Sequence, residues 1–115
     1  MKISKTLLES MWDRSIIICS RAFQISTEST LPDYIISQIQ DKSIQFAEYM
    51  DPDIELETES LKYLKSLEYC NELLLLLKKV ERLSIIHDKY KIVHKNQELQ
   101  ADIEEYKLDI EKIID

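Results

Sequence analysis

Glycine is absent from this chain of 115 residues, and proline occurs only twice. Because glycine lets the backbone approach a phosphate or adopt a positive φ, its absence excludes P-loop and dinucleotide-binding loops. The favoured turns of two-residue β-hairpins lose their usual residue as well. With few residues that break helices, the composition predicts long helices joined by short, stiff connections.

Long apolar runs and paired cysteine motifs are also missing. The longest uncharged apolar run, 73–77, is far too short to cross a bilayer, and the first residues lack the apolar segment of a secretory signal. Cys19 and Cys70 stand alone, without a CxxC spacing, which favours two reduced thiols. We therefore expect a cytoplasmic protein with no membrane segment.

The length predicts a single domain over residues 1–115, with a modest core of the size that oligomerisation often completes. Apolar residues make up 44% of the chain, which excludes a disordered protein despite 32% of charged residues. The net charge of −7 argues against nonspecific binding of nucleic acid by the molecule as a whole.

Apolar residues at intervals of three and four predict two helices in the first half of the chain. The first is expected over about 4–24, with a break at 26–30. Thr30 or Ser29 is expected to cap the second, with Pro32 in its first turn and Asp51-Pro52 at its end. The expected core positions are Leu8, Met11, Ser15, Ile18, Ala22 and Ile25, then Ile35 or Ile36, Ile39, Ser43, Phe46 or Ala47, and Met50.

A third helix is expected to start between Asp53 and Thr58, where clustered acids favour a helix N-terminus. Its expected core positions are Leu61, Leu64, Leu67, Cys70, Leu73 or Leu74, Leu77, Val80 and Leu83. Residues 84–88 are interpreted as a tight connection in which His87 or Asp88 caps the next helix, and one unbroken helix is the alternative.

The last helix has the most regular period in the chain, an a/d heptad pattern. Its members are Ile92, Asn96, Leu99, Ile103, Tyr106, Ile110 and Ile113. Asn96 is either a satisfied amide near the helix start or a contact that sets the register between helices. Four such helices with short loops predict an all-α, antiparallel up-down four-helix bundle.

Several apolar residues lie outside the expected core stripes of the third and fourth helices. They are Tyr63, Tyr69, Leu75, Leu76, Val93 and Leu108. A lone bundle of this size cannot bury all of them, so the sequence predicts self-association, with a ring as the preferred form.

Two segments resemble a known bacterial family. One is LKYLKSLEYCNELLLLLKKVERLSIIHDKY at 61–90, followed by a long amphipathic helix; the other is LPDYIISQIQDKSIQFAEYM at 31–50. They are similar to the four-helix-bundle family of the accessory variability determinant (Avd) of diversity-generating retroelements and of proteins encoded in 23S rRNA intervening sequences. The resemblance implies a homopentamer that binds a reverse transcriptase and its RNA template. The acidic charge of this chain departs from the basic retroelement members.

One region of this acidic chain is locally basic. Residues 78–95 include Lys78, Lys79, Arg82, Lys89, Lys91 and Lys95. On an antiparallel helix pair these side chains converge at one end of the bundle, so we expect the partner to bind there, with nucleic acid contacted only locally.

A second interpretation rests on Arg82 and His87, which match the short Arg-x(4–6)-His signature of HEPN ribonucleases. In such enzymes the pair polarises and protonates the scissile phosphodiester, with the histidine as general acid or base. No metal site is expected, because His87 and His94 have no carboxylate nearby to complete a set of ligands.

The sequence therefore predicts a non-catalytic oligomeric adaptor without a cofactor, which docks a protein or ribonucleoprotein partner such as a reverse transcriptase. The HEPN-type ribonuclease or toxin is the alternative.

Overall fold

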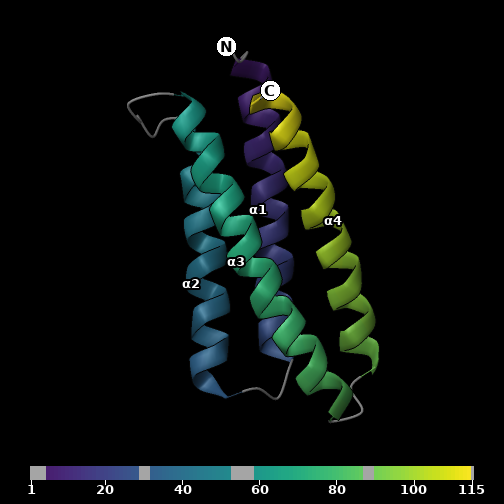
Figure 1. Cartoon of the computed structure of the whole chain (residues 1–115). Helices are drawn as coiled ribbons and strands as arrows, with labels where there is room; N and C mark the ends of the chain where they lie inside the picture. The colour runs from purple at the N-terminus through teal and green to yellow at the C-terminus, as the bar shows by residue number, and fades with distance from the viewer. Residues whose placement is uncertain (1–4, 29–31, 53–58, 87–89, 115) are drawn as a thin grey trace.

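The computed structural model describes residues 5–28, 32–52, 59–86 and 90–114. Within these ranges the chain forms α1 (Lys5–Glu28), α2 (Asp33–Tyr49), α3 (Glu59–Ile86) and α4 (Tyr90–Ile114), and no strand (Figure 1). Each helix packs against its neighbour in sequence, and α1 also packs against α4. The predicted all-α, antiparallel up-down four-helix bundle is confirmed.

The core runs the length of the bundle, which measures 47 × 22 × 18 Å. Phe46 and Tyr106 meet edge to face, with ring centroids 5.2 Å apart. The Tyr106 hydroxyl donates a hydrogen bond to the Met11 carbonyl over 3.1 Å, which ties α4 to α1 inside the core. The predicted a/d positions of the last helix are buried, apart from the half-buried Ile113.

The first helix is longer than predicted. Ser26 and Thr27, expected to break it, remain helical because their hydroxyls donate to the carbonyls of Phe23 and Gln24, three residues earlier, over 2.7 and 3.0 Å. Ser26 is also fully buried.

The second helix ends as predicted, at Tyr49 with Met50 as its C-cap. Its N-cap is Pro32, which was predicted to lie one position later, in the first turn. The Pro32 carbonyl accepts hydrogen bonds from the backbone N–H groups of Ile35 and Ile36, and the N-cap residue makes no side-chain hydrogen bond. The two predicted caps, Ser29 and Thr30, lie outside the described residues.

The core face of α3 differs from the prediction in its first turns. Leu64 is exposed, whereas Tyr63 and Ser66 are buried. Tyr63 leads into Cys70, Leu73 and Leu77 at helical spacing, so in these turns the buried positions lie one residue before the predicted Leu64 and Leu67. The six apolar residues that were expected outside the core stripes differ in burial. Tyr63 and Val93 are buried, Tyr69 and Leu76 are half-buried, and Leu75 and Leu108 are exposed.

The third and fourth helices are separate and antiparallel, which rules out one unbroken helix through 84–88 (Figure 1). The predicted caps His87 and Asp88, and the predicted start of α3 between 53 and 58, lie outside the described residues. Asn96, fully buried, donates from Nδ2 to the Leu77 carbonyl of α3 over 2.9 Å. This asparagine is therefore a contact between helices, and its effect on register stays a prediction.

Candidate functional site

The end of the bundle where α3 finishes and α4 begins carries most of the predicted partner-binding cations; we call it the basic end. Lys78, Lys79 and Arg82 are exposed on α3, and Lys91 is exposed on α4. None of these four pairs with a carboxylate among the described residues. The antiparallel pairing of α3 with α4 places these residues toward one end of the bundle, and the binding of a partner there stays a prediction.

The remaining members of the predicted set differ. Lys95 is half-buried and pairs with Glu28 of α1 over 3.1 Å, so its charge is already balanced inside the bundle. The prediction did not include this partner, which lies 67 residues away along the chain. Lys89 lies outside the described residues.

Lys79 connects the basic end to α2. Its ammonium lies 5.6 Å from the centre of the exposed Tyr34 ring, at the start of α2. This cation–π contact joins the outer face of α3 to the start of α2.

Apolar side chains accompany the cations on that outer face. Leu75 is 69% exposed and Ile86 is 72% exposed, which is unusual for large aliphatic residues. With the cations and the exposed Ile85 they form one stripe at helical spacing, the α3 stripe, whose members are Leu75, Lys78, Lys79, Arg82, Ile85 and Ile86. Such a mixed surface can bind an anionic group and bury apolar area at the same time.

Closer to its N-terminus, the outer face of α3 is different. Glu72 pairs with Lys42 of α2 over 2.8 Å, and Glu68 pairs with Lys65 over 3.4 Å. Both of these acids, which precede Leu75, are thus partnered, and the one acid of α3 after Leu75 is the half-buried Glu81, which forms no ion pair among the described residues. The α3 stripe is a local feature of the basic end.

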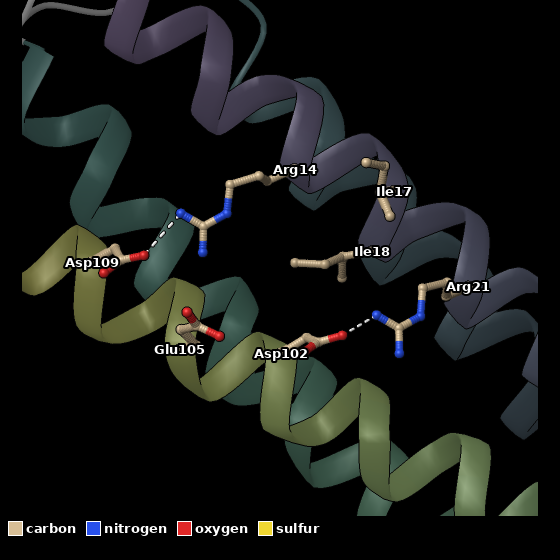
Figure 2. Close-up of a pocket in the computed structure, with 7 residues that line it drawn as sticks. All are labelled: Arg14, Ile17, Ile18, Arg21, Asp102, Glu105 and Asp109. Atoms are coloured by element: carbon tan, nitrogen blue, oxygen red, sulfur yellow. Dashed lines mark hydrogen bonds and ion pairs between the residues drawn. The ribbon is translucent and has the colours of Figure 1, made fainter.

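Sequence reasoning missed a row of ion pairs that joins α1 to α4. The pairs are Arg14–Asp109 at 2.9 Å, Arg21–Asp102, and Glu28–Lys95 at 3.1 Å. The first two cross the groove drawn in Figure 2. On each helix the three residues recur every seven positions, next to the core stripe. That is the g position of the heptad, and in an antiparallel pair g faces g. The seven-residue spacing marks these two rows in the sequence, and the alignment of α1 with α4 decides which residues pair.

A groove of about 300 Å³ lies between these ion pairs. Ile17 and Ile18 line it from α1, and Glu105 lines it from α4, between the two arginine–aspartate pairs (Figure 2). Both arginines already bind carboxylates, and Arg14 also lies 5.0 Å from the Tyr106 ring. The groove is therefore best explained as part of the α1–α4 interface, the least extensive helix–helix interface of the bundle, which the ion pairs bridge. We call this interface the α1–α4 seam.

The catalytic alternative and the possible metal ligands involve Arg82, His87 and His94. Arg82 is an exposed member of the α3 stripe, and its proposed partner His87 lies outside the described residues. The described histidine, His94, is exposed and pairs with Glu98 of the same helix over 3.1 Å. No group of His, Cys, Asp or Glu in the described part of the chain is placed to hold a metal ion.

The two cysteines are unpaired thiols, as predicted. Burial raises the pKa of Cys70 to about 12, and burial also raises the pKa of the half-buried Cys19. Since the thiolate is the nucleophile, both are suited to packing and poorly suited to catalysis. A search of the described helices found none long and apolar enough to cross a bilayer.

Comparison of the chain with protein-family models, with curated proteins and with solved structures found no match.

Proposed function

We propose that this protein is a non-catalytic oligomeric adaptor that docks a protein or ribonucleoprotein partner through its basic end. The observation that carries the proposal is the group of exposed cations on α3 and α4 with no carboxylate partner among the described residues. Lys91 supports it further. It lies in the first turn of α4, where a positive charge opposes the helix dipole at a cost of a few tenths of a kcal/mol.

The resemblance to the Avd family suggests a reverse transcriptase as the partner and a ring, such as a pentamer, as the assembly. Exposed Leu75 and Leu108 are consistent with contacts to another molecule. Light scattering at micromolar concentration tests the assembly, and a strictly monomeric mass would remove the ring from the proposal.

The partner site is tested by capture from the native host with the wild type and with Lys78→Glu/Arg82→Glu/Lys91→Glu. We expect the triple variant to lose capture, and wild-type capture to weaken steeply with salt. The matched control is Lys65→Glu/Lys107→Glu/Lys112→Glu, which makes the same change in charge toward the opposite end of α3 and α4. Helicity and mass are checked first. Unchanged capture by a correctly assembled triple variant would refute the assignment.

A further inference from the structure

We infer that the α3 stripe binds an acidic amphipathic helix of a partner protein, lying alongside α3 from Leu75 to Ile86. This inference rests on the proposed function and names the chemistry of the partner. It is carried by the combination of three cations and three exposed aliphatic side chains on one helical face.

The shape of the stripe favours a helix as the occupant. Its members lie at relative positions 0, 3, 4, 7, 10 and 11, the spacing that places residues on one face. The stripe is therefore a ridge about 16 Å long on a convex surface, at the usual rise per residue. It offers no sheet edge for an extended peptide. Another helix can pack along such a ridge, with its side chains between those of α3.

The charge of the stripe favours an acidic occupant. Lys78 and Arg82 have no carboxylate partner among the described residues: the half-buried Glu81 pairs with neither, and Glu72 is bound by Lys42. Carboxylates on the partner helix would supply the missing negative charge. They would also direct the approach of the partner, since the rest of this protein carries net negative charge.

The apolar members favour a protein over RNA. Leu75 and Ile86 are the most exposed aliphatic side chains of the bundle's described part, and phosphate binding makes no use of them. The stripe has no aromatic side chain on which bases could stack, and the neighbouring Tyr34 ring already contacts the Lys79 ammonium. A second copy in a two-fold arrangement is disfavoured as well, because it would bring the cations of the two stripes together.

The test uses synthetic probes and the full chain. One probe is an 18-residue acidic peptide with leucines at helical spacing on one face and glutamates beside them. The second has the same composition in an order that leaves no apolar face. The third is a single-stranded oligouridine. Binding is measured by fluorescence anisotropy for the wild type, for Leu75→Ser/Ile86→Ser and for Lys78→Glu/Arg82→Glu.

We expect the amphipathic peptide to bind at least about tenfold more tightly than the reordered one, and each double variant to lose at least about tenfold of that affinity. The control variant Ile17→Ser/Leu64→Ser removes two aliphatic residues, 57% and 48% exposed, that lie outside the α3 stripe. It should bind like the wild type.

Three results would overturn the inference. One is equal binding of the two peptides. Another is binding of oligouridine that is tighter than binding of the amphipathic peptide and is unchanged by Leu75→Ser/Ile86→Ser, which would make the stripe a nucleic-acid surface. The last is dissociation of a wild-type oligomer by Leu75→Ser/Ile86→Ser, which would assign the stripe to a second copy. If native capture still depends on Lys78, Arg82 and Lys91, the proposed function stands while this inference fails.

Discussion

Glu28 and Lys95 pair across the α1–α4 seam with the polarity opposite to that of the two ion pairs above them. In the first two pairs the positive charge lies on α1, at Arg14 and Arg21. In the third pair it lies on α4, at Lys95. The third pair therefore makes the charge sequence along each helix asymmetric, and its contribution can be measured separately.

Reversing one charge of this pair should destabilise the bundle, and reversing both should restore it. We expect Lys95→Glu to lower the free energy of unfolding by about 0.5–1 kcal/mol, because two carboxylates then face each other at a partly exposed site. Glu28→Lys/Lys95→Glu should recover most of the loss. Urea unfolding of the double-mutant cycle measures the coupling. Lys91→Glu, on the same helix and without an ion pair among the described residues, is the control. A coupling of zero would mean that the pair is a surface contact with no effect on stability.

Removing the buried hydroxyl of Tyr106 should cost about 1 kcal/mol of unfolding free energy. Tyr106→Phe keeps the ring against Phe46 and leaves the Met11 carbonyl without this donor. Tyr34→Phe, at an exposed tyrosine, should change stability by much less. Equal effects in chemical denaturation would argue against the hydrogen bond as a source of stability.

Asn96→Ala should destabilise the protein by about 1–3 kcal/mol, since it deletes the amide that joins α4 to the Leu77 carbonyl and the acceptor used by Gln100. The exposed neighbour Gln97 provides the control substitution to alanine. Thermal unfolding followed by circular dichroism compares the two. A midpoint for Asn96→Ala as high as that of the control would contradict the role of the asparagine.

Stability should fall as the pH rises above 9 because of Cys70. Burial raises the pKa of this thiol from 9.0 to about 12 in the folded protein. Between these values the unfolded chain releases the proton while the folded chain keeps it, so rising pH favours unfolding. At pH 10.5 the loss relative to pH 8 should be about 2 kcal/mol from this group. Guanidinium unfolding of the wild type and Cys70→Ala at both pH values isolates it, because other titrations are common to both. The stability difference between them should shrink at high pH; a constant difference would contradict the prediction.

We expect no cleavage of single-stranded RNA by the wild type in the presence of a chelator, because the adaptor is proposed to be non-catalytic. Gel analysis of a labelled RNA decides this, with Arg82→Ala/His87→Ala as the comparison. Metal-independent cleavage that disappears in the double variant would establish the HEPN-type alternative.

Much of the fold could be predicted, because the 4-3 spacing of the last helix and the Asp51-Pro52 break are local signals. The face of α3 was harder to predict. Five consecutive leucines at 73–77 fit any helical phase, so the burial of Tyr63 in place of Leu64 depends on packing against the other helices. Ser26 and Thr27 were ambiguous for a different reason, since their hydroxyls can either cap a helix or bond within one.

The candidate site was predictable in part. Clustering of Lys78, Lys79, Arg82 and Lys91 follows from the antiparallel topology alone. The pairing of Lys95 does not, because it depends on a residue of the first helix. Leu75 was expected outside the core stripe, whereas the exposure of Ile86 was not predicted, because it depends on the rotation of α3 about its axis.

The opposite polarity of the third ion pair affects how the first and last helices find their alignment. Sliding α4 along α1 by seven residues would keep apolar positions facing each other, so apolar burial discriminates weakly among such alignments. The charges do discriminate. A shift of seven residues in one direction places Arg21 opposite Lys95, and a shift in the other direction places Glu28 opposite Asp102. Each shift therefore brings two like charges together. Since this seam joins residues most distant in the chain, its closure carries the largest entropic cost among the helix contacts. The three ion pairs thus favour the correct alignment of α4 on α1, which apolar burial alone selects only weakly.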